Sequence, residues 1–174
     1  MPRRPILLAL AIAIATTAGV LWLVGGSRSG CDGLHVTVGC PAPAIHGDQL
    51  GGGAFDPASL SGRPVLVNFW GPSCVPCRDE FPLLEAKIKQ HAPDGFAVVG
   101  VLTDDPPDPA KAFVAQYGAT WPTVLDPDQA LKAAYRVAAR PQSYFVDGSG
   151  IVRSIQIGEV TDADFERQYQ RIAP

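Results

Sequence analysis

Histidine and clustered basic residues are scarce in this sequence, which has only 3 histidines among its 174 residues. His35, His46 and His91 make no close pair, whereas a structural zinc site needs about four ligands. Two of the 14 Lys and Arg residues, Arg3 and Arg4, precede a long apolar run, which leaves 12 against 17 Asp and Glu. This mildly acidic remainder has no basic stripe for a nucleic-acid backbone. We expect no nucleic-acid partner, no bound metal and no cofactor.

Charge is also absent from Ile6 to Val24, an apolar run near the N-terminus. As a helix this run would span roughly 28 Å at about 1.5 Å per residue, close to the hydrocarbon thickness of a bilayer. Arg3 and Arg4 precede it, and because positive charge stays in the cytoplasm, the rest of the chain should face outward. A cleaved signal sequence is the alternative, but its apolar stretch is usually shorter, about 7–15 residues. We expect a single-pass cell-membrane protein anchored by residues 1–26, with an extracytoplasmic catalytic domain.

Two of the four cysteines, Cys31 and Cys40, fall in a Gly-, Ser- and Pro-containing linker at residues 27–43. Residues 44–174 remain for one domain with its own core. An even number of cysteines outside the cytoplasm suits disulfides, and a bridge across this short loop would add about 2–3 kcal/mol of stability. A structural disulfide is the preferred interpretation. A second redox pair is the alternative.

Apolar patterning in residues 44–174 predicts alternating strands and helices. The continuous apolar run at residues 65–70 is typical of a buried central strand. Further strands are expected in residues 95–103 and, as a pair joined by a Gly-rich turn, in residues 142–158; helices are expected at about 75–91, 105–118, 128–135 and from 161 onward. This order of elements indicates a mixed-sheet α/β domain.

The helix expected at residues 105–118 has clear boundary signals. Asp108 is the expected N-cap, Pro109 the first helical residue and Gly118 the terminator.

The stretch "WGPSCVPC" places Cys74 and Cys77 between the central strand and the following helix. At a helix start, unpaired backbone N–H groups and the helix dipole favour a thiolate at Cys74, and the thiolate is the form that attacks disulfides. Cys77 lies one turn later, where it can resolve a mixed disulfide. Half a zinc site or two inert thiols are the alternatives, but no second close Cys or His pair completes a zinc site. The spacing therefore indicates a redox couple.

The sequence "PVLVNFWGPSCVPCRDEFPLL" resembles the thioredoxin-like, membrane-anchored thiol–disulfide oxidoreductases of the TlpA/ResA/CcmG (DsbE) type, which serve cytochrome c maturation. The resemblance extends from about Pro41 to Ile172 and includes "FDPASLSGRPVLVNFW", "GFAVVGVLTDD" and "AYRVAARPQSYFVDGSGIV". It implies a thioredoxin-like mixed sheet flanked by helices, with an extra helix and strand between the two halves. It also implies protein thiols or disulfides as substrates, apocytochrome c among them, and a membrane protein as electron donor.

Three further positions gain a role from this resemblance. Pro141 matches the family's cis-proline, beside which an extended substrate peptide pairs with the backbone. Glu80 matches a partly buried glutamate that handles the protons of the thiols, and its pKa should be raised by desolvation. A solvated glutamate in the first turn is the alternative. Asn68 stands where ordinary thioredoxins have a buried aspartate, and an amide cannot titrate.

The substrate-binding side of the site departs from the family pattern. Ser73 replaces the usual aromatic residue before the first cysteine, and Arg140 replaces an uncharged residue before the cis-proline. Arg140 either points at Cys74 and favours its thiolate, or points to solvent or to a partner's acidic surface. Arg140, Pro141 and Trp70 are the expected substrate contacts.

These features predict an extracytoplasmic thiol–disulfide oxidoreductase, with a reductase of cytochrome c maturation as the leading interpretation. If electrons flowed in the opposite direction, a protein with the same fold would be a general disulfide oxidant or isomerase of secreted proteins. From another class, a non-catalytic module could grip extended peptides beside Pro141 without redox turnover.

Overall fold

The computed structural model describes Cys31 and residues 36–174, so the expected anchor at residues 1–26 lies outside the described residues. Within this described part, no helix combines the length and the apolar character needed to cross a membrane.

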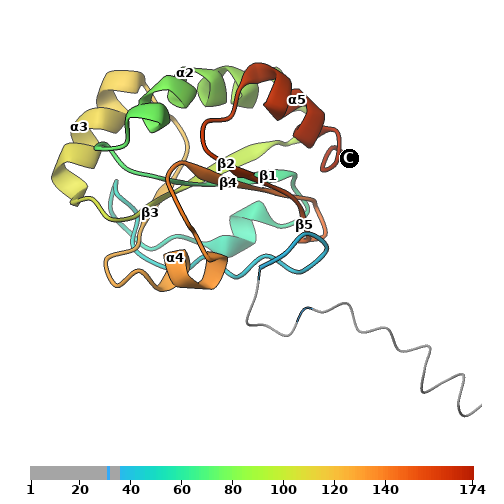
Figure 1. Ribbon diagram of the computed structural model, residues 1–174, viewed down its shortest axis with the longest axis horizontal. Coiled ribbons are helices and arrows are strands. Elements are labelled where there is room, and N and C mark those ends of the chain that lie inside the picture. The colour runs from blue at the N-terminus through green and yellow to red at the C-terminus, as the bar shows by residue number, and fades with distance from the viewer. Residues whose placement is uncertain (1–30, 32–35) are drawn as a thin grey trace, which may run out of the picture. The chain divides into compact units, whose positions relative to one another are not determined.

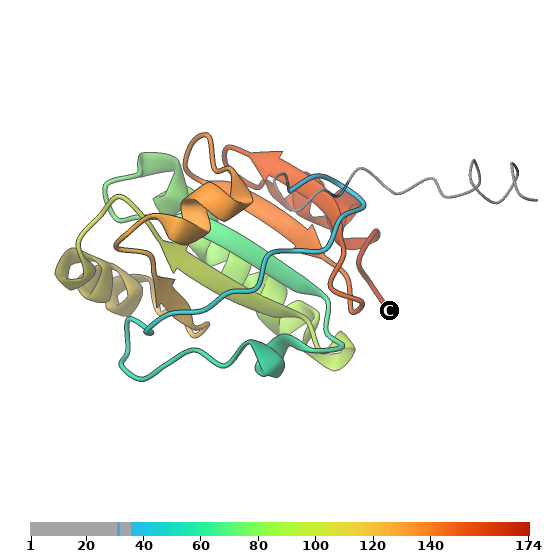
Figure 2. The ribbon, with the colours of Figure 1, turned by 90° about the horizontal axis from the view of Figure 1, so that it is seen from below.

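A five-stranded mixed sheet forms the centre of the domain (Figures 1 and 2). Its strands are β1 (Val65–Trp70), β2 (Ala97–Leu102), β3 (Thr123–Leu125), β4 (Gln142–Val146) and β5 (Val152–Ile157), in the spatial order β3-β2-β1-β4-β5. β2 is parallel to β1 and β3, whereas β4 is antiparallel to β1 and β5. The apolar run at residues 65–70 is the central strand, which confirms the prediction.

Helices cover both faces of this sheet. On one face lie α2 (Val75–Gln90), α3 (Pro107–Tyr117) and α5 (Asp162–Tyr169), and on the other lie α4 (Ala130–Tyr135) and the 3-10 turn η1 (Pro57–Leu60) (Figure 1). A second 3-10 turn, η2 (Ala92–Asp94), follows α2. α3 and β3 lie between β2 and β4 in the chain, in agreement with the expected extra helix and strand.

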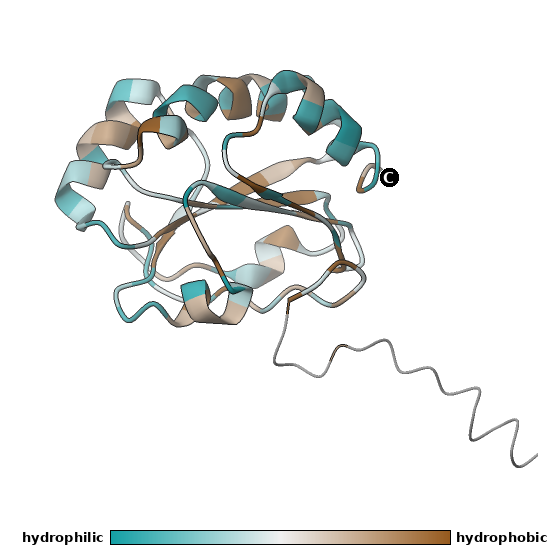
Figure 3. Ribbon diagram, viewed as in Figure 1, coloured by the Kyte–Doolittle hydropathy of each residue, from teal (hydrophilic) through white to brown (hydrophobic). Residues whose placement is uncertain are grey.

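The alternation of side chains along β1 divides the core into two layers. Leu66 and Trp70 pack into the layer beneath α2, α3 and α5. Val65, Val67 and Phe69 pack into the layer beneath α4. Both faces of β1 are therefore buried, and the hydrophobic colouring of Figure 3 follows the strands between the two helical layers.

The start of α3 differs from the expectation. Asp108 is not the N-cap, because α3 begins at Pro107 with Pro106 at the N-cap position, and Asp108 lies inside the first turn. A proline at the first helical position lacks only an N–H that has no partner within the helix, so the chain can enter the helix earlier. Gly118 ends the helix with a φ of 63°, as predicted.

The end of the expected linker packs against the edge of the sheet. The Gly39 N–H donates to the Val152 carbonyl at 2.8 Å, and the Val152 N–H donates to the Cys40 carbonyl at 2.9 Å. Cys40 is buried and forms a disulfide with Cys31. Residues 36–43 are therefore attached to the domain beside the start of β5.

Candidate active site

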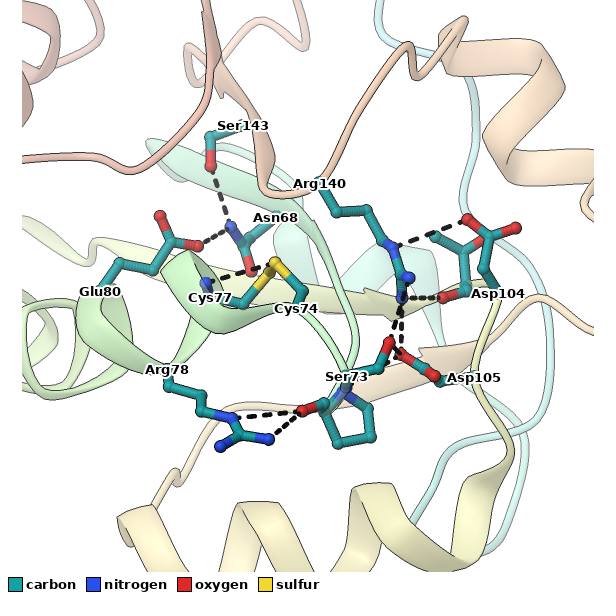
Figure 4. The surroundings of a disulfide bond; sticks show 12 residues. Asn68, Ser73, Cys74, Cys77, Arg78, Glu80, Asp104, Asp105, Arg140 and Ser143 are labelled. Atoms are coloured by element: carbon teal, nitrogen blue, oxygen red, sulfur yellow. Dashed lines mark hydrogen bonds and ion pairs between the residues drawn. A yellow bond between two sulfur atoms is a disulfide. The ribbon is translucent and has the colours of Figure 1, made fainter.

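The disulfide between Cys74 and Cys77 lies where β1 leads into α2 (Figure 4). Cys74 is the N-cap of α2, and its sulfur accepts a hydrogen bond from the Cys77 N–H at 3.3 Å. Cys74 keeps 9% of its surface exposed, whereas Cys77 keeps none. After reduction, the N–H groups and dipole of α2 would stabilise a thiolate on the more accessible of the two sulfurs. The geometry suits attack by Cys74 and closure by Cys77.

Glu80 lies one turn after Cys77 on α2 and is completely buried. Its Oε1 accepts a hydrogen bond from Asn68 Nδ2 at 2.7 Å, and its Oε2 accepts one from the Val160 N–H at 3.1 Å. Desolvation raises the pKa of Glu80 to about 7, although these two hydrogen bonds act in the opposite direction. A carboxyl that titrates near neutral pH is suited to proton exchange with a nearby thiol, and Cys77 lies one turn earlier on α2.

Asn68 connects Glu80 to a residue that sequence reasoning missed. Its Nδ2 also donates to Ser143 Oγ at 3.0 Å, and all three side chains are buried. Ser143 reaches this position because the antiparallel register of β1 and β4 sets Asn68 opposite Ser143. No local pattern around residue 143 could reveal that pairing.

Pro141 lies at the same end of the sheet as the cysteines. The Arg140–Pro141 peptide bond is cis, and Pro141 directly precedes β4. Phe69 is paired with Gln142, so Pro141 lies beside the end of β1. The chain continues from this end of β1 to Cys74. The Pro141 carbonyl accepts a hydrogen bond from the Gly158 N–H at 2.8 Å.

Trp70 does not reach this surface, contrary to the expectation that it contacts substrate. Its side chain is fully buried and packs against Phe81 and Phe113, with ring centroids 4.7 Å and 5.2 Å away. The pleat of β1 directs it into the layer beneath α2 and α3. Trp70 is therefore a core residue that supports the strand leading to the cysteines.

Arg140 is paired inside the protein. Its Nη1 lies 2.7 Å from Asp105 Oδ2 and donates to the Thr103 carbonyl at 2.6 Å, while Asp104 Oδ2 lies 3.6 Å from its Nε. The side chain is only 17% exposed. Neither orientation considered for Arg140 from the sequence included these partners.

Ser73 joins the same group. Its N–H and its Oγ both donate to Asp105 Oδ2, at 3.2 Å and 2.8 Å, and Arg140 Nη2 lies 3.4 Å from the same hydroxyl. Burial by itself would raise the pKa of Asp105, but the hydrogen bonds from Arg140 and Ser73 lower it below its ordinary value. The contact follows from the strand register: Ser73 and Asp105 each lie three residues beyond Trp70 and Leu102, which are paired across two parallel strands.

These features define the class of the protein. An α/β fold with a mixed sheet and a Cys-x-x-Cys disulfide at a helix N-terminus is the arrangement of a thiol–disulfide oxidoreductase with a thioredoxin-like fold. Residues 38–155 match the AhpC/TSA family. The chain belongs to this family and, within it, to the thiol–disulfide oxidoreductases of the ResA/DsbE/HelX type.

Individual proteins show the extent of the similarity. The thiol-disulfide oxidoreductase ResA of Geobacillus kaustophilus is 30% identical over 80% of this chain and 80% of its own length. The thiol:disulfide interchange protein HelX of Rhodobacter capsulatus is 37% identical over 71% of this chain and 70% of its own. The structure of a thiol:disulfide interchange protein of the thioredoxin family from Chlorobium tepidum superposes with a TM-score of 0.70 and 29% identity, covering 78% of this chain and 97% of that one.

Proposed function

We propose that this protein is a membrane-anchored reductase that acts outside the cytoplasm on protein disulfides during cytochrome c maturation. In this proposal residues 1–26 anchor the chain, residues 27–43 form the linker and residues 44–174 carry out the exchange. The substrates are disulfides of apocytochrome c, and a membrane protein supplies the electrons. The similarity to ResA and HelX supports the exchange chemistry, and the buried Glu80 beside the pair is the observation that carries the direction.

The reaction begins with the Cys74 thiolate attacking one sulfur of the substrate disulfide. A Cys74–substrate disulfide forms, and the other substrate sulfur leaves as a thiolate. Cys77 loses its proton to the carboxylate of Glu80, and its thiolate then attacks Cys74 Sγ. This second attack forms the Cys74–Cys77 disulfide and releases the remaining substrate sulfur. Two electrons pass to the substrate, which leaves as a dithiol, and a dithiol on the electron donor later reduces Cys74–Cys77.

Glu80 favours the reducing direction through its charge. A strong disulfide oxidant stabilises its own reduced form, largely by stabilising a thiolate. Glu80, when ionised, places a negative charge in a buried site one turn from Cys77 and so disfavours a thiolate there. A less stabilised dithiol is a better reductant.

Substrate binding is assigned to the backbone on either side of the Arg140–Pro141 bond. An extended peptide can add to this edge by main-chain hydrogen bonds, which leaves its disulfide facing Cys74. Arg140 then contributes its backbone, since its guanidinium is held by Asp105.

Trapping free thiols in intact cells with an alkylating reagent tests the proposal on the full-length chain. Labelling of Cys74 and Cys77 in most molecules is the expected result, with Cys31 and Cys40 unlabelled as the internal reference. A pair that is mostly oxidised would instead support a general oxidant or isomerase. Full function of a Cys74→Ala variant would support the non-catalytic peptide-binding module.

A further inference from the structure

One ion pair joins the three loops that surround the Cys74–Cys77 disulfide (Figure 4). Arg140 belongs to the loop before β4, Asp105 to the loop after β2 and Ser73 to the loop between β1 and α2. The Oδ2 atom of Asp105 accepts from Arg140 Nη1 at 2.7 Å, from Ser73 Oγ at 2.8 Å and from the Ser73 N–H at 3.2 Å. Asp105 therefore connects the residue before the attacking cysteine with the residue before the cis-proline.

Gly71 makes room for this ion pair. A Cβ atom at this position would overlap both Arg140 Nη1 and the Asp105 carboxylate. Arg140 Nη1 also donates to the Thr103 carbonyl at 2.6 Å, and the Arg140 and Asp105 side chains are only 17% and 11% exposed. The guanidinium and the carboxylate thus pack directly against the backbone that leads to Cys74.

The two carboxylates of the loop after β2, Asp104 and Asp105, are both paired with cations. Besides the Arg140–Asp105 pair, Asp104 lies between two cations, with Lys132 Nζ at 2.6 Å and Arg140 Nε at 3.6 Å. Arg78, on α2, donates to the Pro72 carbonyl. Glu80, also on α2, is buried (Figure 4). Arg140 Nη2 lies 3.4 Å from the hydroxyl of the residue before Cys74, and Asp105 is the nearer of the two carboxylates that face Arg140.

We propose that Asp105 is a positioning residue for thiol–disulfide exchange, which holds Arg140 against the loop before Cys74 and cancels the electric field of its guanidinium at that sulfur. An unpaired arginine beside a cysteine stabilises the thiolate and makes the disulfide more oxidising. Pairing of Arg140 with Asp105 removes this stabilisation of the Cys74 thiolate. It also holds the loop before α2 and the loop before β4 against each other. The inference rests on Cys74 as the attacking thiol, as in the proposed function, and holds for either direction of electron flow.

The test is the pKa of Cys74 in the reduced full-length protein. It is read from the pH dependence of iodoacetamide alkylation, with the Cys74 peptide identified by mass spectrometry. Asp105→Asn keeps the shape of the side chain and removes the nearer of the two carboxylates that face Arg140, leaving Asp104 at 3.6 Å, so the pKa of Cys74 should fall by about half a unit or more. Arg140→Gln leaves Asp105 uncompensated, so the pKa should rise by a similar amount. The double variant should return close to the wild-type value.

Two further variants separate charge from structure. Asp105→Glu keeps the charge and should restore a pKa close to that of the wild type. Asp108→Asn removes an exposed carboxylate whose ion-pair partner is Lys111, and it should leave the pKa of Cys74 unchanged. Circular dichroism of each variant shows that it is folded before its pKa is compared.

Opposite shifts in the two single variants are the result that supports the proposal. Shifts in the same direction would mean that loosening of the loop controls Cys74, and an absence of shifts would mean that the ion pair does not act on it; either result overturns the inference. Failure of the proposed function looks different: wild-type Cys74 would then titrate like free cysteine, or its removal would leave exchange with glutathione disulfide intact.

Discussion

Asn68 and Glu80 share a buried hydrogen bond of 2.7 Å, donated by the amide Nδ2 on β1 to the carboxyl Oε1 on α2. The second hydrogen of the same Nδ2 goes to Ser143 Oγ at 3.0 Å. An amide cannot take up or lose a proton near neutral pH, so Glu80 is the titratable member of this buried group. The two predictions that follow depend on that division of roles.

Replacement of Glu80 by Gln should weaken the pH dependence of stability. The pKa of Glu80 in the folded protein, about 7, is above the ordinary value of 4.5, so the folded state binds the proton more tightly than the unfolded state. Glu80 by itself therefore lowers the stability of the wild-type protein by about 3 kcal/mol as the pH rises from about 4.5 to 7. Urea denaturation at pH 5 and pH 8 should show that Glu80→Gln lacks this loss. The matched variant Glu85→Gln, on the same helix, keeps Glu80 and should behave as the wild type; an equal loss in both variants would contradict the prediction.

Replacement of Asn68 by Asp would bring a second carboxyl within hydrogen-bond distance of Glu80 in the same buried site. Two such carboxyls cannot both ionise at low cost, so one pKa of the pair rises further. We expect Asn68→Asp to be less stable than the wild type by about 2–4 kcal/mol at pH 8, with a smaller difference at pH 5. Urea denaturation at both pH values measures this. A difference of equal size at pH 5 and pH 8 would indicate lost packing instead of shared protons.

The sequence was sufficient for features with local signals. The apolar run at residues 65–70 predicts β1, and the Cys-x-x-Cys that follows it predicts a cysteine at the N-terminus of α2, because both depend on neighbouring residues only. The three prolines at positions 106, 107 and 109 show the limit of such signals. Each one suits the start of a helix, so these signals do not distinguish among them, and the prediction of Pro109 as the first residue of α3 is wrong.

Features that depend on the register between strands could not be read from the sequence. The pairing of Trp70 with Leu102 brings Ser73 and Asp105 together, and no property of either residue alone indicates that contact. The expected substrate contact of Trp70 fails for the same reason, because the pleat of β1 turns this side chain into the core. Long-range packing therefore decides which side chains near the cysteines are accessible.

Replacement of Gly71 by Ala should destabilise the protein through the Arg140–Asp105 pair. The added Cβ would overlap the guanidinium and the carboxylate, and overpacking of this kind costs about 1–3 kcal/mol. In a background with both Arg140→Ala and Asp105→Ala the same substitution should cost much less, because both overlapping groups are gone. Gly51→Ala is the matched control, since a Cβ at Gly51 meets nothing within 4 Å, and its effect should stay within about 0.5 kcal/mol. Urea denaturation measures the wild type and these four variants, and an equal cost of Gly71→Ala in both backgrounds would show that the ion pair is not the obstacle.

Removal of the Cys31–Cys40 disulfide should reduce stability without affecting exchange. Cys40 lies beside the beginning of β5, where its carbonyl accepts a hydrogen bond from the Val152 N–H. Pro141 lies beside the opposite end of β5, where its carbonyl accepts a hydrogen bond from the Gly158 N–H. At about 3.3 Å per residue, this separation along the strand is too long for Cys40 to exchange directly with Cys74. The variant with both Cys31 and Cys40 replaced by Ala should lose about 2–3 kcal/mol in urea denaturation. Its rate of reduction of glutathione disulfide should remain within about two-fold of the wild-type rate, since the substituted residues lie at the opposite end of β5 from Pro141. A large loss of this rate, or a trapped disulfide between Cys40 and Cys74, would show that Cys31 and Cys40 are a second redox pair.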